Sequence, residues 1–206
     1  DLRLLRHLPL SSSTLLLFLS GFALYGAMLL IPLYFQQLRG MTPFMAGLLL
    51  IPQGVGSLLS RSLAARLTER IGARWVVLVG FAIVAIGTLP FLGAAEDTSL
   101  VLLGAFLLIR GIGLGAVTVP LMALAFEGLG RDEVPHASVI SRIGQQLGGS
   151  FGTATLAVAL QAALATAAAP AIGFQVAFWW ATGFTVAAVA LSLLLPAGKG
   201  APAQPA

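Results

Sequence analysis

One arginine, Arg110, interrupts an apolar run over residues 99–126 that carries no other charge. The run exceeds the roughly 20 apolar residues that a helix needs to cross a bilayer. A helix that enters near Ser99 places Arg110 about 16 Å along its axis, near the middle of a hydrocarbon core of about 30 Å. A charge at that depth costs about 2.5–3.5 kcal/mol on insertion scales, so it is usually functional or paired. Arg110 is therefore a candidate transport residue that can pair with an anion, bond to helix carbonyls or snorkel.

Two sets of glycines lie in the apolar runs, and the first follows directly on Arg110. Glycine lets a partner helix approach closely, and a proline, here Pro120, loosens the helix backbone. The second set repeats every four residues and forms one smooth face, either for static packing or for two bundles that slide on each other. The predicted helix-packing residues are Gly111, Gly113, Gly115, Gly144, Gly148 and Gly152.

Uncharged polar side chains inside the apolar runs are candidates to line a cavity. Tyr25 and Gln146 lie within such runs, and Gln53 follows Pro52 in the middle of another. These groups can bind an amphipathic small molecule. Equally, they can bond neighbouring helices together at about 0.6 kcal/mol each.

The composition is that of an integral membrane protein. Of the 206 residues, 58% are hydrophobic and 9% are charged, whereas soluble domains carry about 25% charged residues. The net charge of +4 fits basic cytoplasmic loops and does not indicate nucleic-acid binding. Cysteine is absent, which excludes thiol catalysis and thiolate metal sites, and we expect no cofactor and no metal. Because the chain begins at Asp1, we expect a fragment of a longer protein.

Six runs are long enough to be transmembrane helices, and turn and charge signals separate them. This pattern predicts an all-α bundle of six transmembrane helices within residues 1–196 and a disordered tail at residues 197–206. Trp75, Trp179 and Trp180 lie near the predicted span ends, which predicts an aromatic belt. The predicted spans are residues 12–36, 44–64, 75–95, 99–126, 137–165 and 175–195.

The basic residues predict the orientation of these spans. With both termini cytoplasmic, only Arg39 lies outside, while Arg110 and Arg142 fall within spans. This distribution follows the positive-inside rule. The residues then at cytoplasmic ends or loops are Arg3, Arg6, Arg61, Arg66, Arg70, Arg74, Arg131 and Lys199.

The sequence gives little support for an enzyme active site. Residues 148–152 match G-x-S-x-G around Ser150, but a nucleophilic serine needs a histidine within hydrogen-bond reach. His136 lies about 21 Å away along the same helix, and His7 is near the N-terminus. The acidic residues all lie in loops or near span ends, so the carboxylate of a proton-coupled carrier is expected elsewhere in the full chain.

The segment AARLTERIGAR, residues 64–74, links the second and third spans. On physical grounds it is either an ordinary positive loop or a tight gating turn that locks helix ends by ion pairs. The segment resembles the signature G-x-L-A-D-R-x-G-R-R of the major facilitator superfamily, from which Ala65, Thr68 and Ala73 depart. The gating candidates are Glu69, where aspartate is usual, and Arg70, Gly72 and Arg74, which match.

Three further stretches resemble the C-terminal half of fourteen-helix drug:proton antiporters of the EmrB/QacA type. They are LYGAMLLIPLYFQQLRGMTPFMAGLLLIPQG from Leu24, IRGIGLG from Ile109 and QQLGGSFGTA from Gln145. The resemblance implies two six-helix bundles around a central cavity that work by alternating access, with only the second bundle present. It also likens Arg110 to the arginine of the superfamily's fourth-helix motif, which in the first half is tied to proton coupling.

The sequence is therefore interpreted as the C-terminal half of a bacterial multidrug or antibiotic efflux transporter in the plasma membrane. The implied partners are the lipid bilayer, the missing N-terminal bundle, an amphipathic small molecule and protons. Two alternatives stay open: an uptake permease of the same superfamily, and a six-helix channel or assembly subunit that acts as an oligomer.

Overall fold

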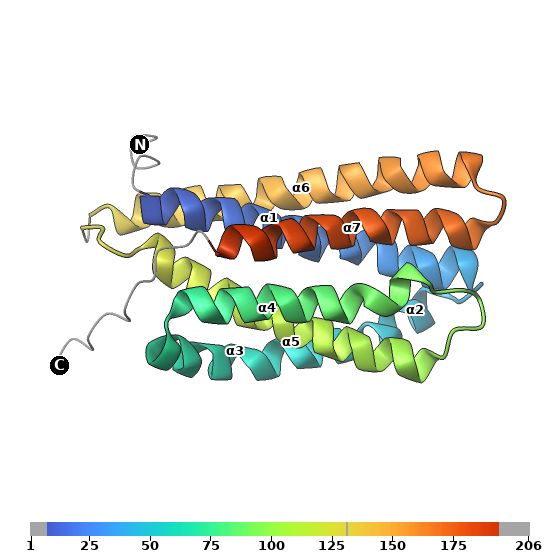
Figure 1. Cartoon of the computed structure of the whole chain (residues 1–206), viewed down its shortest axis with the longest axis horizontal. Coiled ribbons are helices and arrows are strands. Elements are labelled where there is room, and N and C mark those ends of the chain that lie inside the picture. The colour runs from blue at the N-terminus through green and yellow to red at the C-terminus, as the bar shows by residue number, and fades with distance from the viewer. Residues whose placement is uncertain (1–7, 131, 194–206) are drawn as a thin grey trace.

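The computed structural model describes residues 8–130 and 132–193, and every regular element in this part of the chain is helical (Figure 1). Six helical segments are long and apolar enough to cross a membrane, which confirms the predicted six-helix class. The predicted tail at residues 197–206 lies outside the described residues, as do Arg3, Arg6, Arg131 and Lys199. The elements are α1 (Leu8–Leu33), a π-helical turn (Tyr34–Leu38), α2 (Pro43–Leu49), α3 (Ile51–Ile71), α4 (Ala73–Thr88), a 3₁₀ turn (Leu89–Leu92), α5 (Leu100–Ala125), α6 (Val134–Thr166) and α7 (Pro170–Ser192).

The start of α7 differs from the sequence prediction. The predicted spans leave a break at residues 166–174, but α7 begins at Pro170, because proline fits the first turn of a helix. As a consequence, Trp179 and Trp180 lie near the middle of α7 and not at its end. The aromatic-belt interpretation is therefore wrong for these two residues.

The second span is broken. Its two parts, α2 and α3, meet at Leu50. Pro52 has no N–H to donate to the carbonyl of Leu48, and its ring crowds that carbonyl, so a continuous helix is disfavoured here. The break places Gln53 in the first turn of α3, where its backbone N–H donates to the Leu50 carbonyl at 3.1 Å.

The loop predicted at residues 64–74 is almost entirely helical. The α3 helix continues to Ile71 and α4 starts at Ala73, so Gly72 is the single residue between them. Gly72 has φ +86° and ψ 151°, a backbone conformation that residues other than glycine rarely adopt. The helix extends beyond the apolar run because its long basic side chains can keep their charged ends in water.

Four spans lie in a row in the order α6, α1, α5, α3, and each contacts the next. The helices α4 and α7 pack on one side of this row and on each other (Figure 1). No helix of the described chain covers the opposite side. The least buried of the six spans are the two at the ends of the row: the span formed by α2 and α3 at one end, and α6 at the other.

The two most extensive helix contacts in the bundle join α1 to α6 and α5 to α3. Glycines permit both: Gly148 lies against the backbone of Phe18, and Gly56 lies against the backbone of Leu108.

An aromatic cluster closes one end of the bundle. The buried ring of Tyr34 makes edge contacts with Phe91, Phe174 and Phe178. Its hydroxyl donates to the Ala95 carbonyl at 2.8 Å. The end of α1 is thereby fixed to the turn before α5 and to α7.

Candidate functional site

Arg110 joins three helices in the interior of the bundle. It lies on α5 and is only 2% exposed. Its Nη1 donates to Oε1 of Gln53 on α3 at 3.0 Å. Its Nη2 donates to the backbone carbonyl of Ala23 on α1 at 2.7 Å. The guanidinium therefore connects the first, second and fourth spans.

Neutral oxygens alone bond this cation within the described part of the chain. The structure shows the helix-carbonyl contact that was one of the three predicted options, and the burial of Arg110 leaves no room for snorkelling. Its Nε finds no hydrogen-bond partner among residues 8–130 and 132–193. Hydrogen bonds from a charged donor are roughly twice as strong as neutral ones, which offsets part of the desolvation cost. The described acidic residues lie in loops or near span ends: Glu69, Glu96, Asp97, Glu127, Asp132 and Glu133.

Two glycines allow the backbones around Arg110 to approach closely. A Cβ on Gly87 of α4 would lie 2.7 Å from the Cα of Arg110. A Cβ on Gly111 would lie 2.8 Å from the carbonyl carbon of Gln53. Both distances are far below ordinary carbon contacts of about 3.5–4.0 Å. The position of Gln53 beside Arg110 therefore depends on Gly111.

A second set of polar side chains lines a hollow of about 470 Å³ between α1 and α6. Tyr25 is partly exposed and its ring packs on Gly149, while Gln146 lies on the exposed surface of α6. Ser150 and Thr153 donate their hydroxyl protons to carbonyls of their own helix, so their oxygens can accept further bonds. The hollow is lined by Tyr25, Leu29, Gln146, Gly149, Ser150, Thr153, Ala154 and Ala157.

The four predicted cavity residues thus fall into two groups. Arg110 and Gln53 are bonded to each other and lie outside the lining of the hollow. Tyr25 and Gln146 both line it. The hollow contains no charged side chain, so it can offer hydrogen bonds and an aromatic face but no ionic contact.

The six predicted packing glycines all lie at helix crossings. On α6 the face built by three of them packs on α1, against Thr14, Phe18 and Phe22. The α5 glycines pack on α3 and α4. Gly113 has as little room as the others, since a Cβ there would lie 2.6 Å from the Gly80 carbonyl oxygen. A Cβ would clash with a neighbouring helix at each of the six positions, which are Gly111, Gly113, Gly115, Gly144, Gly148 and Gly152.

The gating candidates gather around the single-residue turn at Gly72. Glu69 and Arg70 are exposed on the last turns of α3, and Arg74 lies in the first turn of α4. The guanidinium carbon of Arg74 lies 6.0 Å from the centre of the Trp75 ring, at the outer limit of a cation–π contact. In the described part of the chain, Arg74 makes no ion pair with Glu69.

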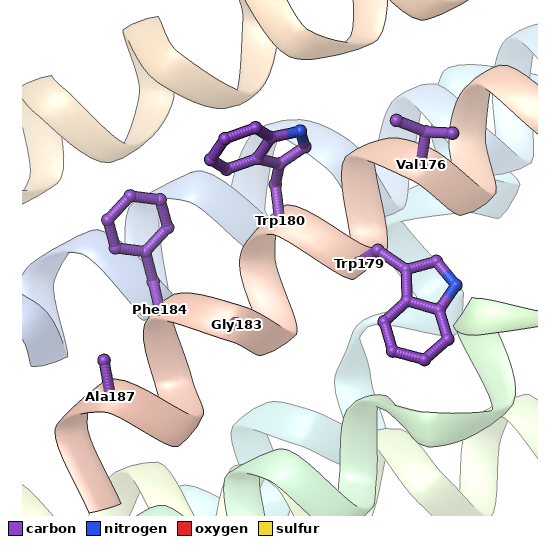
Figure 2. A pocket seen from close by; sticks show the side chains of 6 residues that line it. All are labelled: Val176, Trp179, Trp180, Gly183, Phe184 and Ala187. Carbon is purple, nitrogen blue, oxygen red and sulfur yellow. The ribbon is translucent and has the colours of Figure 1, made fainter. Parts of the chain in front are cut away.

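The surface of α7 carries an apolar hollow of about 520 Å³ that the sequence did not indicate. Figure 2 shows Trp179 and Trp180 pointing in different directions from the helix, with Phe184 one turn further along. Both indoles are more than half exposed. This aromatic side of the bundle contrasts with the polar hollow between α1 and α6.

Two features of the Arg110 site had no signal in the sequence. The carbonyl of Ala23 is a backbone group that every residue has, and it lies 87 positions from Arg110. Gln53 was identified as an intramembrane polar residue, but its pairing with Arg110, 57 positions away, was not. Both contacts follow from helix packing and from no local pattern.

Comparison with known proteins identifies clear relatives. The family model described as Major Facilitator Superfamily matches residues 1–153. The chain is 33% identical over 162 residues to the multidrug resistance protein B homolog of Mycobacterium tuberculosis, which is 78% of this chain and 30% of that protein.

Other relatives have related names. The chain is 32% identical over 155 residues to the lincomycin resistance protein LmrB of Listeria monocytogenes, covering 75% of this chain and 33% of that protein. It is 31% identical over 150 residues to the multidrug resistance protein Stp of Mycobacterium tuberculosis, covering 72% of this chain and 28% of that protein. The matched part of the chain spans about a third of the length of these curated relatives.

Proposed function

This chain belongs to the major facilitator superfamily, and on that premise we propose that it is the C-terminal six-helix half of a bacterial multidrug efflux transporter. Membership in a superfamily of transporters argues against an enzyme and against the alternative of a six-helix channel subunit. Relatives named for multidrug and lincomycin resistance match along most of the chain, which supports drug-like cargo. In this proposal a second bundle, carried by the rest of the full-length protein, completes the transport pathway.

The observation that carries the proposal is the polar hollow between α1 and α6, to whose lining neither α4 nor α7 contributes. Tyr25 and Gln146 lie about 26 and 18 Å along their helices, well inside the membrane. Polar groups at such depth usually face protein or a water-filled cavity and not lipid. We therefore place the missing bundle opposite this hollow, so that the cavity forms between the two bundles.

The chemistry of the hollow suits an amphipathic molecule. It combines the Tyr25 ring with the amide of Gln146 and the hydroxyl oxygens of Ser150 and Thr153. Apolar walls with a few hydrogen-bonding groups are typical of small-molecule sites. Because no charge lines the hollow, the hollow itself offers cargo no ionic contact.

The proposed transport is proton-coupled antiport by alternating access. A coupling carboxylate must lie in the membrane, and we assign it to the other bundle, because the described acidic residues lie in loops or near span ends. The turn at Gly72, with Arg70 and Arg74, is proposed to contact the other bundle at the cytoplasmic surface. Both ends of this segment are proposed to be cytoplasmic, in the bacterial plasma membrane.

The full-length gene tests this function in an efflux-deficient bacterial strain. We expect raised resistance to a panel of ethidium, chloramphenicol and lincomycin, relative to empty vector. Everted membrane vesicles separate efflux from the uptake alternative, because an efflux protein accumulates drug in them when a proton gradient is imposed. Equal susceptibility with and without the gene for all three drugs would refute the multidrug proposal. Accumulation only in right-side-out vesicles would favour an uptake permease.

A further inference from the structure

The orientation of the Gln53 amide is set by its bond to Arg110. An arginine side chain has only donors, so the oxygen of the amide must face it. The 3.0 Å contact from Nη1 to Oε1 has this arrangement. The NH₂ group of Gln53 is therefore turned away from the guanidinium, and Gln53 cannot rotate its amide without losing this bond.

The amide nitrogen of Gln53 has no partner among the described residues. No hydrogen bond from Nε2 is found in the described part of the chain, and this atom is not among the buried unpartnered atoms. It therefore keeps some accessible surface. Gln53 sits about 15 Å from the start of its span, just after the break at Leu50, so this free donor is deep in the membrane.

Arg110 makes this donor stronger. A cation that bonds to the oxygen of an amide draws electron density from the NH₂ group, and linked hydrogen bonds in a low-dielectric site strengthen one another. The group that satisfies such a donor must be an oxygen acceptor, and the nearby positive charge favours oxygens with negative character. The alternative, an unsatisfied donor in hydrocarbon, is costly.

We propose that Gln53 donates a hydrogen bond to an acceptor oxygen of the transported molecule, and that Arg110 is a positioning residue that acts through Gln53. This inference rests on the proposed transport function and deepens it. The cargo molecules that make this contact carry a carbonyl, hydroxyl or carboxylate oxygen. Arg110 itself does not touch the cargo, since it is 2% exposed and two of its nitrogens are already bonded within the bundle.

The test uses the full-length transporter in everted vesicles with two probes. Chloramphenicol carries acceptor oxygens, and ethidium carries none. Gln53→Glu keeps the contact with Arg110 but removes both amide donors, and Gln53→Met removes them without adding charge. We expect either variant to raise the KM for chloramphenicol about tenfold, the value of one such bond. Gln53→Met, which adds no charge, should leave the KM of the cation ethidium nearly unchanged. Gln161→Glu, the same change on an exposed residue of α6, is the matched control.

A double-mutant cycle tests whether Arg110 acts through Gln53. Lysine lacks the fork that holds both partners, so Arg110→Lys should raise the chloramphenicol KM in the presence of Gln53. In the Gln53→Met background it should add less than twofold. Additive effects of the two changes would overturn the positioning role.

Several results would overturn the proposed contact with cargo. A chloramphenicol KM unchanged in both Gln53 variants would mean that Gln53 is only a structural partner of Arg110. Equal changes for ethidium and chloramphenicol would mean that the donor contacts the other bundle. If a variant is inserted poorly into the membrane, its KM can still be compared with that of the wild type, because KM does not depend on the amount of protein. If the wild type transports neither probe, the proposed function is refuted. If the wild type transports both and only the predicted KM changes of the Gln53 variants are missing, the proposed function stands and only the contact with cargo is refuted.

Discussion

Replacing Gly148 by alanine is expected to separate α1 from α6. The added Cβ would lie 2.6 Å from the carbonyl carbon of Phe18 and 2.8 Å from its Cα. Carbon atoms pack best at about 3.5–4.0 Å, so the two helices must move apart by about 1 Å. The obstacle is backbone, which cannot rotate away as a side chain would.

The cost extends along the whole crossing. Gly144 packs on Thr14 and Gly152 on Phe22 in the same face, with Cβ positions 2.6 and 2.7 Å from those residues. A gap of about 0.5–1 Å loses a quarter to a half of the dispersion energy at each contact. Overpacked sites typically cost 1–3 kcal/mol, and with a backbone obstacle we expect about 3 kcal/mol, which is about 150-fold in the unfolding equilibrium.

The control is Gly104→Ala on α5. A Cβ there meets nothing within 4 Å. Alanine is favoured over glycine in a helix by up to about 1 kcal/mol. The same chemical change is therefore expected to leave the stability unchanged or to raise it slightly.

The free energy of unfolding can be measured on the purified full-length transporter by SDS titration in mixed micelles, followed by circular dichroism. We expect Gly148→Ala to unfold at markedly lower SDS and Gly104→Ala at the same or higher SDS. If the two variants unfold at the same SDS concentration as the wild type, the α1–α6 crossing is not closely packed and the argument from Gly148 fails.

Four further outcomes are expected. Gly72→Ala should lower the unfolding free energy by about 1–3 kcal/mol because of its positive φ, and wild-type stability in the SDS titration would contradict the assigned turn. Tyr34→Phe should cost about 1 kcal/mol in the same titration, since the Ala95 carbonyl loses its buried donor; no loss would mean that water replaces the bond. Arg110→Met removes a buried charge at similar volume, so folded protein should stay in the membrane while the chloramphenicol KM rises; a normal KM would reduce Arg110 to a structural residue. The 206-residue chain alone, reconstituted in liposomes, should move no dye and no protons, because alternating access needs two bundles; flux above empty liposomes would refute the half-transporter interpretation.

The sequence alone predicted the number and helical type of the spans and the position of Arg110 within the fourth of them. These features are local, since each segment enters the membrane according to its own length and apolarity. Errors arose where one residue allows two structures. Pro170 can end a segment or begin a helix, and it begins α7. The arginine-rich segment at residues 64–74 can be a loop or a helix that extends into water, and only Gly72 is non-helical.

Only the tertiary structure decided what surrounds Arg110. Its acceptors, Gln53 and the carbonyl of Ala23, lie 57 and 87 positions away along the chain. Helices in lipid gain no hydrophobic energy by associating, so close van der Waals contact and a few polar bonds select their partners. Those contacts depend on glycines that meet another backbone, as Gly111 meets Gln53. The sequence shows such a glycine, but the backbone it meets is fixed only when all six helices are packed.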